Sequence, residues 1–106
     1  MRPELGLPAL LVVMSMATVV PAHAETIQVT VDKLDFLPAD IKAKVGDTIE
    51  WVNKDVFAHT ATVRGDWDVM IQPKKSASFV LKVPGDVEYY CRFHPNMKGR
   101  ISVAPK

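Results

Sequence analysis

The segment Cys91-Arg92-Phe93-His94-Pro95-Asn96-Met97 places a thiol, an imidazole and a thioether at three-residue spacing. It follows directly on an apolar run that ends in Tyr89-Tyr90. Upstream, His59 supplies a second imidazole, and residues 25–106 contain no further histidine. All four of these side chains can donate an electron pair to a metal ion. The segment is therefore a candidate metal site that includes His59 as its fourth donor.

The mixture of donors indicates which metal would bind. Two imidazoles, one thiolate and a weak thioether form the ligand set of a type 1, or blue, copper site, in which the soft sulfur ligands suit Cu(I). A closed zinc site is less favourable, because thioether is not among the usual zinc ligands. We expect residues 91–97 to form a short loop in which Pro95 restricts the backbone. His59 would then reach this loop from across the fold, so that metal binding would add to stability.

Each of these residues also has a simpler interpretation. Cys91 can be a small buried hydrophobe, and Met97 can fill a gap in the core. His59, taken alone, can be an ordinary polar strand or loop residue. We assign Met70, which lies outside the segment, to packing. The shared spacing of the three donors favours ligation for Cys91, His94 and Met97, and His59 is then the missing imidazole.

Apolar residues in the rest of the chain recur at every second position, which is typical of strands with one buried face. Segments with this pattern, or with a short apolar run, are residues 27–31, 41–45, 49–51, 77–83, 87–91 and 101–103. Turn residues separate them, and no window has a helical apolar stripe. We predict a single all-β domain, an antiparallel β-sandwich or barrel. We expect the irregular residues 63–75 to cross between sheets, and we assign four aromatic residues to the core: Trp51, Phe79, Tyr89 and Tyr90.

Composition excludes several classes of protein. The 106 residues carry 13 basic and 12 acidic side chains, a formal net charge of +1. A nucleic-acid-binding domain normally has a basic surface, so we expect no nucleic acid partner. A single cysteine excludes an internal disulfide. A small domain that is exported, as the N-terminal residues described next indicate, usually needs a disulfide or another cross-link for stability. Because a disulfide is excluded here, a bound metal ion is the first alternative.

The N-terminal residues have the pattern of an export signal. Arg2 precedes an uncharged apolar stretch over residues 5–20, and Ala22-His23-Ala24 fits a signal peptidase site. We expect residues 1–24 to be removed and residues 25–106 to form the mature domain in the periplasm. The alternative is an uncleaved membrane anchor, but the stretch is shorter than the roughly 20 residues needed to span a bilayer. We therefore expect no membrane insertion after cleavage.

The chain resembles the cupredoxin family of blue copper proteins. The compact C-x-x-H-x-x-M segment is most similar to that of the amicyanins, whereas plastocyanins and pseudoazurins have longer loops. The resemblance extends to the Trp51-Val52-Asn53-Lys54-Asp55 approach to His59 and to Tyr89-Tyr90-Cys91. It implies a Greek-key β-sandwich, with copper at one end and electron transfer as the activity.

The resemblance also implies a role for individual residues. His59, Cys91 and His94 would be the strong copper ligands and Met97 the weak axial one. The edge of His94, next to Pro95, would be the surface through which electrons pass. Asn53 and Thr60 would lie around the ligands. Thr60 stands where the family usually has an asparagine that hydrogen-bonds to the cysteine loop, and its hydroxyl can still form such a bridge.

The function that follows is a soluble, monomeric one-electron carrier, not an enzyme. The resemblance implies redox protein partners, namely an amine dehydrogenase or another donor and a c-type cytochrome as acceptor. The alternative is a copper-handling module with the same ligands, although no methionine-rich or histidine-rich tract is present. A Cys91–His94 nucleophile pair would need further groups that we do not find. Six basic residues would form either a rim at the copper end or a solvated face: Lys54, Lys74, Lys75, Arg92, Lys98 and Arg100.

Overall fold

A computed structural model describes residues 23–106 of the chain. These residues form nine strands and no helix. The strands are β1 (Thr26–Asp32), β2 (Asp35–Leu37), β3 (Asp40–Lys44), β4 (Thr48–Asn53), β5 (His59–Val63), β6 (Trp67–Ile71), β7 (Ser76–Val80), β8 (Gly85–Cys91) and β9 (His94–Ala104). Residues 23–106 therefore contain no helix with the length and the apolar character needed to cross a membrane.

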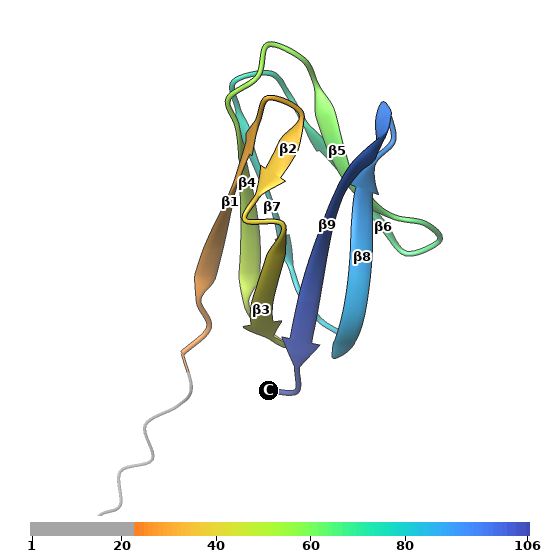
Figure 1. The fold of residues 1–106 in the computed structure, drawn as a ribbon. Helices are drawn as coiled ribbons and strands as arrows, with labels where there is room; N and C mark the ends of the chain where they lie inside the picture. The colour runs from red at the N-terminus through yellow and green to blue at the C-terminus, as the bar shows by residue number, and fades with distance from the viewer. Residues whose placement is uncertain (1–22) are drawn as a thin grey trace, which may run out of the picture.

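The strands form two sheets that face each other (Figure 1). One sheet has the order β2-β1-β4-β7, and the other has the order β3-β9-β8-β5-β6. The predicted all-β sandwich is confirmed, but it is not wholly antiparallel. Strands β1 and β4 pair in parallel, as do β3 and β9. The chain leaves the first sheet after β2, forms β3 in the second and returns as β4, which therefore runs in the same direction as β1. Alternating apolar residues identify a strand and its buried face, but they do not identify the direction of its neighbour.

Six of the strands coincide with segments that the sequence predicts, and β2, β5 and β6 do not. Residues 63–75 do cross between the sheets, as predicted, but they are not irregular throughout. Trp67–Ile71 form β6, which pairs antiparallel with β5 along its whole length. The crossing to β7 is confined to residues 72–75. The alternation of partly or fully buried Trp67, Val69 and Ile71 with exposed Asp68 and Met70 would have identified this strand.

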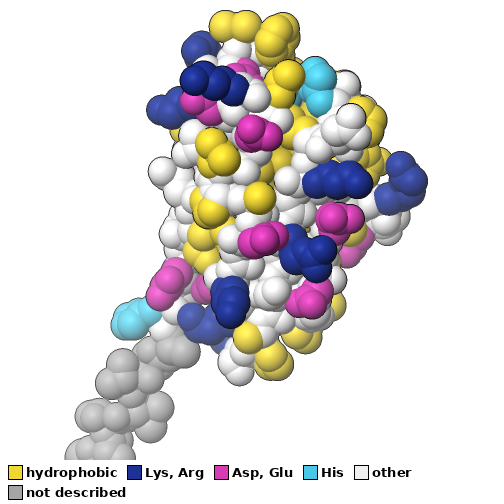
Figure 2. Space-filling model, viewed as in Figure 1, with side chains coloured by type: hydrophobic (Ala, Val, Ile, Leu, Met, Phe, Trp, Pro, Cys, Tyr) yellow, Lys and Arg dark blue, Asp and Glu magenta, His cyan; other side chains and the backbone are white. Residues whose placement is uncertain are grey.

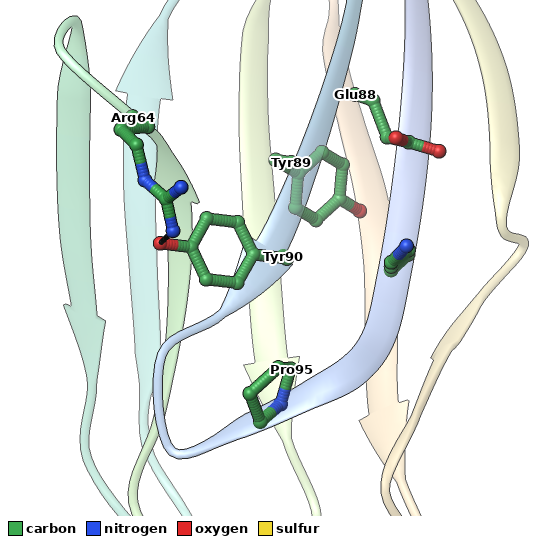
Figure 3. A pocket seen from close by; sticks show the side chains of 6 residues that line it. Arg64, Glu88, Tyr89, Tyr90 and Pro95 are labelled. Carbon is green, nitrogen blue, oxygen red and sulfur yellow. Dashed lines mark hydrogen bonds between the residues drawn. The ribbon is translucent and has the colours of Figure 1, made fainter.

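The core lies between the sheets and contains a group of packed aromatic rings. Trp51 on β4 and Tyr89 on β8 are buried, and their rings meet edge to face at 5.6 Å. The indole Nε1 of Trp51 donates a hydrogen bond of 3.2 Å to the Tyr89 hydroxyl. Phe79 packs partly buried against this core. The assignment of Tyr90 to the core is wrong, because successive residues of a strand point to opposite faces. Its hydroxyl accepts a hydrogen bond of 3.0 Å from Arg64 on the outer surface (Figure 3).

Gly99 on β9 lies opposite Tyr89 in the β8–β9 ladder. A Cβ at this position would lie 2.3 Å from Cζ of Tyr89, far inside carbon–carbon contact distance. The missing side chain therefore lets the Tyr89 ring lie over β9 and reach Trp51. A glycine is required here by the close approach of the ring.

Asp47 holds the turn between β3 and β4. Its carboxylate is buried and accepts hydrogen bonds of 2.9 Å from the backbone N–H groups of Glu25 and Lys44. Burial by itself would raise the pKa of this carboxyl group. The two hydrogen bonds and the charge of Lys44 outweigh burial, so the pKa lies below its ordinary value.

Candidate metal centre

A tight hairpin between β8 and β9 brings Cys91 and His94 together. Cys91 is the last residue of β8 and His94 the first of β9, and the two are directly opposite each other in the ladder. Only Arg92 and Phe93 lie between them. The next pair in the ladder is Tyr90 with Lys98, so residues 95–97 form a bulge on β9. The expected loop over residues 91–97 is therefore a two-residue turn followed by a bulged strand, which bends β9 at this end.

His59 is the first residue of β5, which pairs with β8 in the same sheet. The expectation that His59 reaches the other donors from across the sandwich is therefore wrong. The distance from Nδ1 of His59 to Sγ of Cys91 is 3.7 Å, and the distance from Nδ1 of His94 to the same sulfur is 3.8 Å. The three donor atoms all lie within 4.8 Å of one another. His59 and Cys91 are fully buried, and His94 is partly exposed.

Met97 lies within the bulge of β9 and is buried, with 4% of its surface exposed. With Phe93 and His94 it borders a surface pocket at this end of the sandwich. Leu34 from the turn between β1 and β2 borders the same pocket. The structure thus places the Met97 side chain beside the hairpin that holds Cys91 and His94.

Asp55 orients the ring of His59, a contact that the spacing of the donors in the sequence does not indicate. Its Oδ2 lies 2.8 Å from Nε2 of His59. A carboxylate can only accept, so Nε2 carries a proton, and in the neutral ring Nδ1, on the side of Cys91, keeps its lone pair. The Asp55 carboxylate also accepts hydrogen bonds of 2.7 and 3.1 Å from the backbone N–H groups of Lys33 and Leu34. Burial tends to raise the pKa of Asp55, but these hydrogen bonds and that of His59 lower it overall.

Asn53 holds the segment that carries Asp55 and His59. The side chain is buried, and its Nδ2 donates hydrogen bonds to the carbonyl oxygens of Phe57 (2.8 Å), Gln72 (3.1 Å) and Ile71 (3.3 Å). Its Oδ1 accepts a hydrogen bond of 2.9 Å from the N–H of Asp55. Asn53 therefore fixes the backbone between β4 and β5 from within.

Thr60 contacts the sulfur of Cys91 and also the backbone of the next residue, Arg92. Its backbone N–H donates to Sγ of Cys91 over 3.4 Å. Its hydroxyl oxygen accepts a hydrogen bond of 2.8 Å from the N–H of Arg92, which belongs to the peptide that follows Cys91. The threonine hydroxyl thus forms the bridge to the cysteine hairpin at the position where the family usually has asparagine.

Apolar side chains lie beside the partly exposed His94. The rings of Phe57 and His94 lie 6.4 Å apart, and Phe57, Val56 and Phe93 are about half exposed or more. Figure 2 shows hydrophobic side chains beside a histidine at this end of the molecule. The exposed edge of the site therefore opens into an apolar surface.

Four of the six basic residues considered above have side-chain or backbone contacts of their own. Lys74 donates to the carbonyl oxygen of Lys54 at 2.6 Å, so these two residues are in contact. Arg92 is paired with Asp68, and Arg100 lies 4.0 Å from Asp40. Two of the six charges, those of Arg92 and Arg100, are thus paired with a carboxylate, as expected of a solvated face.

The donors fit a copper ion. A buried thiolate between two imidazole nitrogens combines one soft ligand with two ligands that serve both oxidation states of copper. The imidazole that is wholly buried has its outer nitrogen bound to a carboxylate, an arrangement typical of metal-ligating histidines. The arrangement suits a single metal ion at the end of the five-stranded sheet.

Comparison with known proteins is consistent with this chemistry. The chain is 28% identical to amicyanin from Paracoccus versutus over 76% of its own length, and the match spans 66% of that relative. The crystal structure of the same amicyanin superposes with a TM-score of 0.65, covering 79% of this chain and 84% of the other. The methylamine utilization protein MauL of Methylorubrum extorquens is 30% identical over 81% of this chain and 80% of that protein.

A plastocyanin from Nostoc punctiforme is 36% identical, over 92% of this chain and 88% of that protein. The sequence model of a protein family, the Cupredoxin-like domain, matches residues 6–103 of this chain. The match therefore includes all nine strands except the last residue of β9. From this match, and from the sandwich with its His–Cys–His cluster, it follows that the chain belongs to the cupredoxin-like family.

Proposed function

We propose that residues 25–106 form a type 1 copper protein that carries single electrons between redox partners. The observation that carries this proposal is the cluster of His59, Cys91 and His94, whose donor atoms lie within 4.8 Å of one another at the end of one sheet. These three residues would hold one copper ion, with Met97 as a weak axial ligand. Bound copper would supply the one-electron couple between Cu(I) and Cu(II).

The residues around the donors would keep the site rigid during electron transfer. Asp55 holds the ring of His59 at 2.8 Å, and Asn53 holds the backbone that carries both residues. Thr60 holds the sulfur and the backbone of the hairpin at Cys91. A ligand set that cannot move when the charge of the metal changes needs little reorganisation. Full burial of His59 and Cys91 also excludes water from these two donors.

Electrons would enter and leave through the edge of His94. This is the partly exposed imidazole of the pair, and it lies beside Phe57, Phe93 and Pro95. An apolar contact surface suits a transient complex with a protein partner, because it can be desolvated at little cost. Pro95 belongs to this surface because it follows His94 directly and is exposed.

Similarity to an amicyanin and to a methylamine utilization protein supports a redox partner that takes part in amine oxidation. The donor would be an amine dehydrogenase or another redox protein, and the acceptor would be a c-type cytochrome. The protein would act as a monomer in the periplasm. Its leader would be residues 1–24, cleaved before Glu25, and all but the last two of these residues lie outside the described part of the chain. The position of β1, which begins at Thr26, is consistent with a mature domain that begins at Glu25. We propose no enzymatic activity.

The test is the visible spectrum of residues 25–106 after addition of Cu(II), followed by ascorbate. We expect an intense blue band that disappears on reduction and returns on reoxidation. Cys91→Ser should lack the band, because the absorption requires a copper–thiolate bond, whereas Met70→Leu, outside the site, should keep it. A weakly absorbing complex that loses copper on reduction would instead support the copper-handling alternative and contradict electron transfer.

A further inference from the structure

A ring of hydrogen bonds runs from the protein surface to the Cys91 hairpin. Asp68 on β6 lies opposite Thr62 on β5, and the Thr62 hydroxyl donates to Asp68 Oδ1 at 2.6 Å. The hydroxyl oxygens of Thr62 and Thr60 are 2.8 Å apart. Thr60 Oγ1 accepts from the backbone N–H of Arg92 at 2.8 Å. The Arg92 guanidinium closes the ring with bonds of 3.0 and 3.2 Å to the two carboxylate oxygens of Asp68.

The two ends of this ring set the direction of every proton within it. The N–H of Arg92 can only donate, and the carboxylate of Asp68 can only accept. The Thr62 hydroxyl therefore points at Asp68, and the Thr60 hydroxyl points at Thr62. The Thr60 oxygen is left with a lone pair directed at the Arg92 N–H. The Arg92 guanidinium, followed by the Thr62 hydroxyl, holds the pKa of Asp68 below its ordinary value, which keeps the acceptor charged.

The ring meets Cys91 through Thr60. The Arg92 N–H belongs to the peptide bond that joins Cys91 to Arg92, so the bond to Thr60 fixes the backbone on the C-terminal side of Cys91. The backbone N–H of Thr60 lies 3.4 Å from Sγ of the same cysteine. Thr60 is fully buried and Thr62 nearly so, whereas the Asp68 side chain is half exposed. A surface carboxylate is thus connected to the sulfur environment by two buried hydroxyl groups.

We propose that Asp68 is a positioning residue for Cys91 that acts through Thr62 and Thr60, an inference that rests on the proposed role of Cys91 as a copper ligand. We call the Asp68–Thr62–Thr60 part of the ring the hydroxyl relay. It fixes the position of Thr60, whose own backbone N–H donates to the sulfur of Cys91. A hydrogen bond to a thiolate withdraws electron density from it and so favours the reduced metal. Loosening the relay should therefore shift the redox equilibrium toward the oxidised form.

The first experiment compares two variants at position 62. Thr62→Val removes the hydroxyl group while keeping the charge and nearly the shape of the side chain, and Thr62→Ser keeps the hydroxyl group. At a fixed solution potential, we expect Thr62→Val to lower the ratio of reduced to oxidised protein by about fivefold, the factor that corresponds to one hydrogen bond. Thr62→Ser should behave like the unmodified protein. The proposal is wrong if Thr62→Val leaves the ratio unchanged, or if Thr62→Ser shifts it equally.

The second experiment uses the metal-free protein and hydrogen exchange of the Arg92 and Thr60 amides. Asp68→Asn should raise both exchange rates by about fivefold, because the carboxylate that orders the relay is lost. Asp40→Asn is the matched control, since Asp40 also faces an arginine on this sheet but has no hydroxyl relay. Equal exchange rates in the two variants would overturn the proposal. This readout does not depend on copper, so a failure of the proposed function would be seen separately, as a missing blue band in the unmodified protein.

Discussion

Cys91 and His94 face each other across the β8–β9 ladder with only two residues between them, and their donor atoms are 3.8 Å apart. The third donor, His59, is equally near to the sulfur but is fully buried, whereas His94 is partly exposed. The two imidazoles therefore lie at nearly equal distances from the sulfur but differ in their access to solvent. This difference can be tested directly by removing each ring.

His94→Gly should open a metal position to solvent. We expect the blue band to be lost and then largely restored by added imidazole, because the vacated site borders a surface pocket. His59→Gly is the matched control, and imidazole should restore it poorly, since that ring lies in the interior. The measurement is absorbance during an imidazole titration. Equal rescue of both variants would contradict the assigned access route.

Asp55→Ala should weaken copper binding by about tenfold to a hundredfold, the usual effect of losing a carboxylate partner of a ligating histidine. It should also destabilise the metal-free protein. Lys33 and Leu34 both have positive φ, of 52° and 65°, and Asp55 binds both of their N–H groups. The measurements are copper affinity by competition with a chelator and urea unfolding of the metal-free protein.

A second pair of changes separates the two roles of Asp55. Lys33→Asn with Leu34→Gly gives the turn residues that adopt positive φ readily. In the Asp55→Ala background this pair should recover part of the lost stability. It should leave the copper affinity low, because His59 still lacks its partner. Recovery of copper affinity would mean that Asp55 acts on the site only through the turn.

Gly99→Ala should destabilise the protein by about 1–3 kcal/mol, as expected for overpacking in a core. The new Cβ would displace the Tyr89 ring and its hydrogen bond from Trp51. Urea unfolding measures the loss. In a Tyr89→Leu background the same substitution should cost less, because the clashing ring is gone. An equal cost in both backgrounds would show that the Tyr89 ring is not the cause.

Asp47→Asn should destabilise the metal-free protein at neutral pH by about 1–3 kcal/mol, because an amide NH2 group would face one of two backbone N–H donors. The folded protein holds the pKa of Asp47 below its ordinary value. Its contribution to stability is therefore present above the unfolded-state pKa of about 3.9 and is lost as pH falls through the lower folded-state pKa. The difference between the two proteins in urea unfolding should shrink below about pH 4. If the difference in unfolding free energy persisted undiminished in acid, Asp47 would not act as an ionised, hydrogen-bonded carboxylate. Asp86→Asn, on the exposed face of β8, is the control variant.

The sequence predicted the sandwich, because strands with one buried face carry the two-residue period of apolar residues. It did not reveal β5, the strand that begins at His59. Four of the five residues of β5 are buried, so both faces of the strand are covered, and two of these residues are Thr60 and Thr62. Its only apolar residues, Ala61 and Val63, are small, so the alternation is short and weak. The segment that supplies one of the two imidazoles therefore had only a weak strand pattern.

Cys91, His94 and Met97 were visible as a group because they are close in sequence, and the family resemblance pointed to Asn53 and Thr60 around them, but Asp55 and Asp68 were not predicted as supporting residues. Asp55 and Asp68 each act by accepting hydrogen bonds from residues that lie in other strands or turns. Such contacts depend on which strands are neighbours, and apolar periodicity does not encode strand order or direction. The position of His59 relative to the hairpin was predicted wrongly for the same reason, since β5 and β8 belong to one sheet.

The two-residue turn between Cys91 and His94 also bears on the order of events during folding. Hairpins of this size close within microseconds, whereas pairing of distant segments waits for long loops to close. His59 is 32 residues away from Cys91 along the chain. Two of the three donors can thus be neighbours before the sandwich exists, and the third arrives only with the slower pairing of β5. In a newly synthesised chain that meets copper early, the hairpin would therefore bind the metal first, and the later docking of β5 would complete the metal's environment.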